Sequence, residues 1–151
     1  MMSNHAQTGR VEWIGLRSER LAKIEVVPAA RIELSGLVGD HSRAGKRAVT
    51  LMQAEHLDVI ARLVGLPTVT PETLRRNIVV SRINLLALKN TPIRIGSAIL
   101  KIEGPCPPCS RMEKSLGHGG YNAMRGHGGW YASVIEAGDI NLGSDVAPAD
   151  Y

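Results

Sequence analysis

The stretch Ile93-Arg-Ile-Gly-Ser-Ala-Ile-Leu-Lys-Ile-Glu-Gly-Pro-Cys-Pro-Pro-Cys109 carries the pattern that decides the fold class. Residues 93–95 form a short apolar run that ends at Gly96, and alternate positions of residues 97–103 are then apolar. A period of two residues is typical of a β-strand, and the Gly- and Pro-rich residues 104–109 end it in a turn. The stretch therefore predicts two strands, followed by a turn that holds both cysteines of the chain.

The same pattern of short strands recurs along the chain. We expect further strands at residues 11–16, 31–34, 48–51, 78–80 and 130–136, and a turn at residues 137–139. This gives about seven or eight short strands, without the regular alternation of strands and helices that a parallel sheet requires. The sequence predicts a mainly β fold, a barrel or sandwich of mostly antiparallel strands.

One segment has the period of a helix and is expected to be inserted between the strands. Apolar residues recur at helical spacing over residues 57–64, and Gly65 supplies a stop. Thr50 and Gln53 have the spacing of a capping box, which predicts that they start this helix. Shorter helical turns are expected from Pro71 and over residues 110–116.

The length and composition fit one globular domain. The chain has 151 residues, of which 44% are apolar and 21% are charged. We expect a flexible N-terminus at residues 1–9 and a single domain at residues 10–151. Charged residues interrupt any signal-peptide core in the first thirty positions, and no segment has the length of a membrane span. The sequence therefore predicts a cytoplasmic protein that does not bind membranes.

The basic charge is too dispersed to predict a nucleic-acid interface. The formal net charge is +4, but basic residues alternate with acidic ones along most of the chain. The densest block, Arg75-Arg76, is short, and no aromatic-rich strand is available for stacking bases. We therefore expect no nucleic-acid partner.

The two cysteines of the Cys106-Pro-Pro-Cys109 turn are the first candidates for chemistry. Cys109 is favoured, because a helix starting after it, together with Arg111 and Lys114, would lower its pKa and expose a thiolate. Inert buried thiols and a thiol-disulfide exchange pair are alternatives. A zinc site completed by His118 and His127 is a further alternative, although its spacing matches no standard finger.

Two other polar segments are candidate binding residues. Arg75, Arg76 and Asn77 could hold a phosphate or carboxylate through guanidinium and amide contacts, or could form a solvated turn. Asp40 and His41 could act as an acid-base or ligand pair, or could form a structural turn. The residues alone leave these alternatives open.

Several of these motifs, in this order, resemble the MOSC domain, the C-terminal domain type of molybdenum cofactor sulfurases. The resemblance covers residues 10–147 as a small stand-alone member. It is carried by Gly36-Leu-Val-Gly-Asp-His41, Ala48-Val-Thr-Leu-Met52, Leu74-Arg-Arg-Asn-Ile-Val-Val80, Ile93-Arg-Ile-Gly96 and Gly104-Pro-Cys-Pro-Pro-Cys-Ser-Arg-Met112. It implies a MOSC-type β-barrel-like fold and a role in molybdenum cofactor chemistry.

The resemblance also implies roles for particular residues. Cys109 would ligate molybdenum or carry sulfur as a persulfide, while Arg76 and Asn77 would lie near the phosphate of the molybdopterin. Asp40, His41 and Arg111 are expected to line the same cofactor site. A soft thiolate suits molybdenum or sulfur transfer, and a forked guanidinium suits phosphate.

The implied activity is reduction of N-hydroxylated substrates or transfer of sulfur. Larger relatives carry additional domains that have no counterpart here. We therefore expect a separate sulfur donor or electron-transfer protein as partner, and no pyridoxal phosphate. Alternatives are a non-enzymatic cofactor carrier and a redox protein that uses the Cys106 and Cys109 pair.

Overall fold

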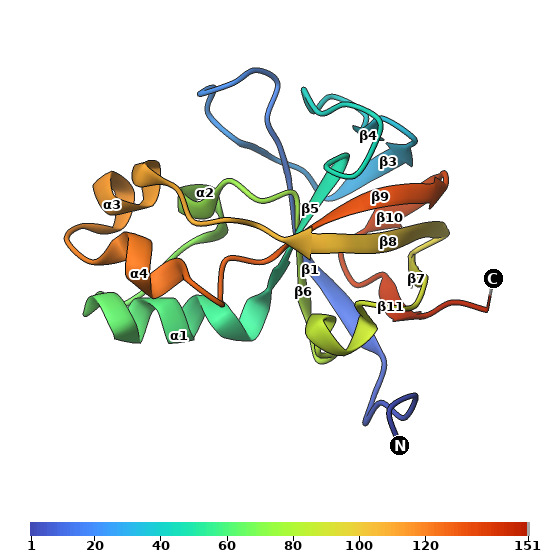
Figure 1. The fold of residues 1–151 in the computed structure, drawn as a ribbon. Helices are drawn as coiled ribbons and strands as arrows, with labels where there is room; N and C mark the ends of the chain where they lie inside the picture. Colours follow the sequence, from blue (N-terminus) through green and yellow to red (C-terminus); the bar gives the residue numbers. More distant parts are fainter. Residues whose placement is uncertain (151) are drawn as a thin grey trace.

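Seven strands close into a β-barrel. The computed structural model describes residues 1–150, and its strands follow the order β11-β7-β8-β9-β5-β6-β1, with β1 pairing back to β11 (Figure 1). The mainly β prediction is confirmed. The barrel strands are β1 (Gly9–Leu16), β5 (Val49–Gln53), β6 (Ile78–Ser81), β7 (Ile93–Ile95), β8 (Ala98–Pro105), β9 (Trp130–Glu136) and β11 (Asp145–Pro148).

The stretch from Ile93 to Cys109 forms the β7–β8 hairpin and the turn that leaves the barrel, as predicted. Ile93 lies opposite Leu100 and Ile95 opposite Ala98, and all four side chains are buried. All barrel pairs are antiparallel except β5 and β6, which run parallel. Parallel neighbours need a crossover connection, and α1 and α2 supply it here. The mostly antiparallel character is therefore confirmed.

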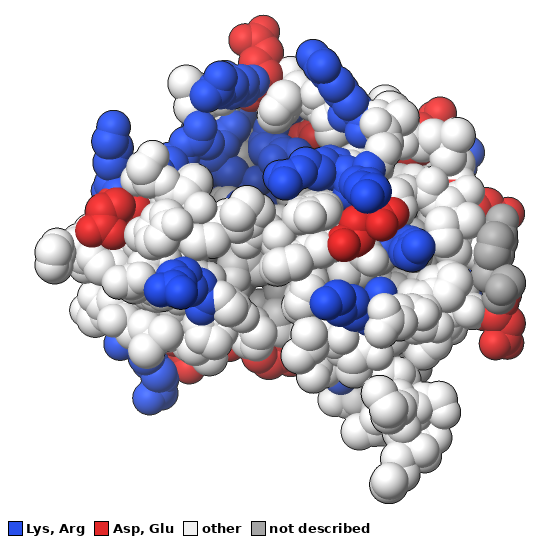
Figure 2. All heavy atoms as spheres, in the orientation of Figure 1, with Lys and Arg blue, Asp and Glu red and all other residues white. Residues whose placement is uncertain are grey.

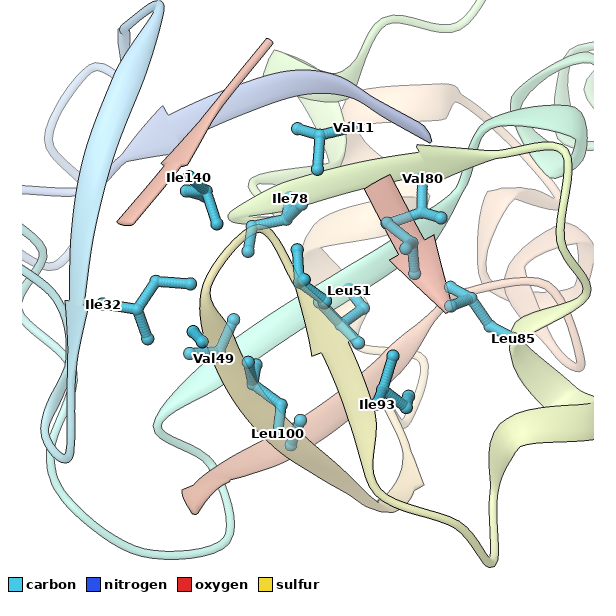
Figure 3. Close-up of a cluster of buried hydrophobic side chains, with 14 of the residues drawn as sticks. Val11, Ile32, Val49, Leu51, Ile78, Val80, Leu85, Ile93, Leu100 and Ile140 are labelled. Atoms are coloured by element: carbon cyan, nitrogen blue, oxygen red, sulfur yellow. The ribbon is translucent and has the colours of Figure 1, made fainter. Parts of the chain in front are cut away.

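The barrel interior is filled by aliphatic side chains. Figure 3 shows Val49 and Leu51 from β5, Ile78 from β6 and Leu100 from β8 pointing toward one another, and none of them is exposed to solvent. Branched aliphatic side chains pack well on a pleated surface. They fill the barrel although the chain contains no Phe. The barrel is a packed core rather than a channel.

A small sheet covers one end of the barrel and corrects one prediction. It contains β10 (Gly138–Asn141), β3 (Ala29–Glu33) and β4 (Gly36–Leu37), while β2 (Glu25–Val26) pairs with the end of β1. The turn predicted at residues 137–139 is wrong, because Gly138 starts β10 opposite Ile32. A side chain at Gly138 would collide with the backbone of Ser97 and Ala98, so glycine is used here for close packing.

The four α-helices gather on one side of the barrel, apart from the short 3-10 helix (Figure 1). They pack a second apolar cluster that includes Met52, Ile60, Leu74, Met112 and Met124. None of the helices in residues 1–150 is long and apolar enough to cross a membrane. The helical elements are α1 (Ala54–Val64), α2 (Pro71–Leu74), the 3-10 helix η1 (Leu85–Leu88), α3 (Ser110–Leu116) and α4 (Gly120–Met124).

The predicted long helix is confirmed, but its predicted capping box is wrong. α1 ends at Gly65 in the left-handed conformation, as expected. Thr50 and Gln53 belong to β5, and Gln53 makes no side-chain cap. Its buried amide instead donates to the Ile83 carbonyl over 2.9 Å and accepts from the Leu85 backbone N–H over 2.9 Å. Tertiary contacts therefore outweigh the local capping pattern.

Candidate functional site

A buried ion pair forms where β1 and β4 end. Arg17 Nε lies 3.1 Å from Asp40 Oδ1, and Arg17 Nη2 lies 3.0 Å from Asp40 Oδ2. The Asp40 side chain is 0% exposed and that of Arg17 is 16% exposed. Burial alone would raise the pKa of Asp40, but the hydrogen bonds and charge of Arg17 outweigh it and lower that pKa. The carboxylate is therefore held ionised inside the protein.

Asn77 extends this pair into a network that joins β1, β5 and the loop after β4. Its Oδ1 accepts from Arg17 Nη2 over 3.2 Å and from the Thr50 backbone N–H over 3.0 Å. Its Nδ2 donates to the Gly15 carbonyl over 3.1 Å and to Asp40 Oδ1 over 3.2 Å. The residue is 0% exposed, and these partners lie on β1, β5 and the loop after β4. The amide is satisfied within the protein.

Asp40 and Asn77 were both predicted to line a cofactor site. The structure brings them together, but it places their side chains behind Arg17, where they orient its guanidinium and fix the ends of β1 and β6. A direct contact of either residue with a ligand stays a prediction. Arg17 itself was not predicted, because its partners are 23 and 60 positions away in the sequence.

In front of this network lies a cleft, which we call the arginine cleft, with two halves that meet at Arg17 and His41. The cysteine half is lined by Arg17, Arg20, Leu21, His41, Leu74, Arg75, Arg76, Cys109, Arg111 and Met112. The lysine half is lined by Arg17, His41, Ser42, Arg43, Ala44, Lys46, Arg47 and Thr50.

The arginine cleft concentrates positive charge. Within residues 1–150, eight of the chain's 18 Lys and Arg residues line it, and none of its 14 Asp and Glu residues does. Figure 2 shows Lys and Arg side chains gathered along the upper face of the molecule. A recess with cationic walls and no lining carboxylate favours an anionic ligand. The sequence shows these cations as dispersed, because only the fold brings them together.

The turn between α2 and β6 presents two of these arginines. Arg75 has a left-handed backbone (φ 57°) and donates from Nη1 to the Ala22 carbonyl. Arg76 donates from Nε to the Gly128 carbonyl over 2.9 Å and from Nη1 to the Leu74 carbonyl over 2.7 Å. Burial and the positive charges of Arg111 and Arg17 lower the pKa of Arg75. The cations are therefore crowded enough to repel one another.

His41 lies at the boundary of the two halves. Its Nδ1 is 2.9 Å from the Arg17 carbonyl oxygen, and a carbonyl only accepts hydrogen bonds. Nδ1 therefore carries the hydrogen, and in the neutral ring Nε2 is left with a free lone pair. Protonation would turn Nε2 into a donor.

Cys109 opens into the cysteine half. It is exposed and occupies the position directly before α3, so the helix predicted after it is confirmed. Arg75, Arg76 and Arg111 line the same half. The structure thus assembles the predicted Cys109, Arg76, His41 and Arg111 around one recess. A thiol and several guanidinium groups converge there.

Cys106 has different surroundings. It directly follows β8, where its backbone N–H donates to the Gly129 carbonyl over 2.9 Å, and it is only partly exposed. It lines a separate recess of about 380 Å³ together with His56, Asn84 and Trp130. Burial raises the pKa of the Cys106 thiol, although the charges of Arg76, Arg47 and Arg17 oppose this rise.

The zinc alternative is not assembled in the fold. Within residues 1–150, no three His, Cys, Asp or Glu side chains come close enough to hold one metal ion. His118 is fully exposed beside Glu113, and the His127 ring instead meets the edge of His56 with centroids 5.3 Å apart. The cysteines and histidines considered for zinc therefore do not form a shared site.

Known proteins share both the sequence pattern and the fold. The family model of the MOSC domain matches residues 38–147. The YuaD protein of Bacillus subtilis is 19% identical and superposes with a TM-score of 0.79, over 93% of this chain and 94% of that one. YiiM from Geobacillus stearothermophilus is 14% identical, with a TM-score of 0.74 over 94% and 75% of the two chains.

YiiM from Escherichia coli is 20% identical, with a TM-score of 0.71 over 94% of this chain and 70% of that chain. At these identities the solved structures establish the fold alone. No curated protein sequence matches the chain. The family model covers most of the barrel, the loop with Asp40 and His41, the arginine turn and both cysteines. The chain belongs to the MOSC domain family.

Proposed function

We propose that the cysteine half of the arginine cleft binds the molybdenum cofactor with which the MOSC family is associated, and that Cys109 is its thiolate ligand to the metal. The observation that carries this proposal is the placement of an exposed cysteine in a recess lined by five arginines and no carboxylate. The phosphate of the cofactor is anionic and its metal accepts soft ligands, which is the chemistry that these side chains offer.

The residues fit the two ends of such a ligand. Arg75, Arg76 and Arg111 offer forked donors that match the oxygens of a phosphate. Cys109 offers a soft donor that suits molybdenum, and its exposure leaves space around the metal for a substrate. Asp40 and Asn77 contribute indirectly, because they hold Arg17 and thereby the wall between the two halves.

The reaction that we propose is reduction of an N-hydroxylated compound. When bound, the cofactor supplies two-electron oxygen-atom chemistry. The reaction breaks the N–O bond, consumes two electrons and two protons, and releases the amine and water. The electrons would come from a separate electron-transfer protein.

His41 is suited to deliver a proton in this reaction. Its Nδ1–H is fixed on the Arg17 carbonyl, so Nε2 is the atom that can take a proton from solvent and donate it to the departing oxygen. The surrounding arginines keep their charge at every pH of interest and cannot take this role.

The proposal is tested with protein purified from a host that makes the cofactor. We expect molybdenum and pterin near one per chain, and reduction of an N-hydroxylated base when an electron donor is supplied. His41→Gln is expected to keep the metal and to lower kcat by about 10²-fold or more. Protein without molybdenum and without pterin would overturn the proposal.

Sulfur transfer is the second candidate, and the exposure of the Cys109 thiol favours it. A persulfide relay needs an accessible sulfur and no bound metal. Mass spectrometry of metal-free protein treated with a sulfur donor would then show one added sulfur atom on Cys109. Pterin bound without turnover would instead support a cofactor carrier.

A further inference from the structure

The lysine half carries positive charge beyond what the cysteine half already provides. Arg43, Lys46 and Arg47 line it, and in the described part of the chain none of them lies within 4.0 Å of a carboxylate oxygen. Like charges placed together lower stability unless a ligand neutralises them. Five other arginines already line the cysteine half with Cys109, which is ample for one phosphate.

The donors of the lysine half are free, whereas those of the cysteine half are partly occupied. Arg75 and Arg76 donate to backbone carbonyls, as described above. Across residues 1–150, Arg43, Lys46 and Arg47 make no side-chain hydrogen bond to the protein. Their charged N–H groups are therefore available to a ligand.

The loop that carries these cations is anchored on both sides. Asp40 is fixed by Arg17 before it, and Ala48 and Val49 are fully buried after it. Ser42 Oγ donates to the Ser35 carbonyl over 2.9 Å. The Arg47 guanidinium carbon lies 4.5 Å from the centroid of the Tyr131 ring, a cation-π contact that orients the side chain. The positive groups thus project from a defined backbone.

We propose that the lysine half is a second anion subsite and that it binds the phosphate of a phosphorylated substrate whose reacting group lies at Cys109. This assignment rests on the proposed function only for the ligand in the cysteine half. A phosphomonoester carries nearly two negative charges at neutral pH, which three cations can neutralise. The lysine half is open and has a volume of about 610 Å³, and it joins the cysteine half at His41.

The test is an NMR titration of cofactor-free protein with inorganic phosphate. We expect two separate sets of shifting amides, one at residues 42–47 and one near Arg75 and Arg111. The double variant Arg43→Gln, Lys46→Gln is expected to weaken the first set at least tenfold, since hydrogen bonds to charged groups are the strong ones, and to leave the second set unchanged.

The matched control is Arg94→Gln, Lys101→Gln, which removes the same two charge types from exposed positions of β7 and β8. It should leave both sets unchanged. The subsite is overturned if residues 42–47 do not shift, or if both double variants weaken them equally. Because no molybdenum is involved, this result stands apart from any failure to find metal in the purified protein.

The source of the phosphate is decided with cofactor-loaded protein. An N-hydroxylated nucleoside and its 5′-monophosphate are compared as substrates and as ligands. We expect the monophosphate to have a KM at least tenfold lower with a similar kcat, and the Arg43→Gln, Lys46→Gln variant to remove this advantage. Two phosphorus atoms per molybdenum in the loaded protein would show instead that the cofactor fills both halves, and would overturn the substrate assignment.

Discussion

Cys106 and Cys109 are three positions apart, yet they belong to different parts of the molecule. Cys106 directly follows β8, is partly buried, and lines a recess together with Gln53, His56 and Asn84. Cys109 is exposed in the arginine cleft, directly before α3. The same side chain is therefore mostly shielded from solvent on one side of the turn and exposed in the arginine cleft on the other.

The Pro-Pro turn therefore separates two chemical environments. A thiol that is desolvated resists ionisation, whereas an accessible thiol among cations can bind a metal or attack an electrophile. Reactivity within the motif follows from the elements that flank it.

The largest effect is expected from replacing each cysteine by serine in protein made in a cofactor-producing host. Cys109→Ser should lower the retained molybdenum more than a hundredfold, because even groups behind a metal ligand contribute about 10- to 100-fold. Cys106→Ser should keep most of the metal. Equal losses of molybdenum in the two variants, measured by elemental analysis, would erase the distinction between the cysteines.

The next effect concerns the network that supports the cleft side. Asp40→Asn leaves Arg17 as a buried charge without its counterion, and should lower the free energy of unfolding by about 3 kcal/mol or more. Asp139→Asn is the matched control, since the Asp139 pair with Arg31 is exposed and is worth less than about 1 kcal/mol. Urea unfolding of both variants measures the difference. Equal midpoints would show that the buried pair does not stabilise this wall.

Alkylation rates compare the thiols directly. Iodoacetamide should modify Cys109 about tenfold faster than Cys106 at pH 8, because Cys109 is exposed while burial raises the pKa of Cys106. Peptide mass spectrometry after short exposures resolves the two sites. Saturating phosphate should slow only Cys109. Faster modification of Cys106 would reverse the assignment.

The smallest effect is the pH dependence of stability, which should differ between the two sides. Burial and the charge of His127 lower the pKa of His56, although the charge of Glu55 opposes this shift. As the pH falls, His56 therefore becomes protonated in the unfolded protein before it does so in the folded protein. The His56 contribution to stability is thus lost as the pH falls from 6.5 through the lower folded-state value. The pKa of Asp40 is also lowered, so the contribution of Asp40 to stability persists as the pH falls to 3.8 and is lost below that pH.

Urea unfolding at intervals between pH 7 and pH 3 separates the two contributions. His56→Gln should flatten the profile just below pH 6.5 and leave the acid limb intact. Asp40→Asn should remove part of the loss below pH 4. An unchanged slope near pH 6 in the His56 variant would assign the early loss to another group.

Most of the fold could be predicted from local patterns. The hairpin of β7 and β8 follows from the alternation of residues 93–103, and α1 follows from its apolar face and Gly65. These elements have a period that burial requires and a residue that ends them. The start of α1 could not be predicted, because buried partners at Ile83 and Leu85 use the Gln53 amide.

The candidate site could be predicted only in part. Cys109, Arg76, His41 and Arg111 were expected, and they line one cleft. Arg17 was missed because an arginine after a strand has no local signal, and its role depends on Asp40 and Asn77 in distant segments. Arg43, Lys46 and Arg47 were not predicted to line the site, since only the fold brings them beside Arg17 and His41.

The pairing of β1 with β11 also has a consequence for how the molecule folds. Gly9 lies opposite Val146, so this contact joins segments from nearly opposite ends of the described chain. Contacts between distant segments form slowly, because closing a long loop costs chain entropy before the contacts can contribute favourable free energy. During synthesis, the edge of β1 at Gly9 and Arg10 therefore stays uncovered until β11 has been made. Arg17 follows the other end of β1, next to β2, so a chain stalled before β11 would leave the strand edge at Gly9 and Arg10 uncovered.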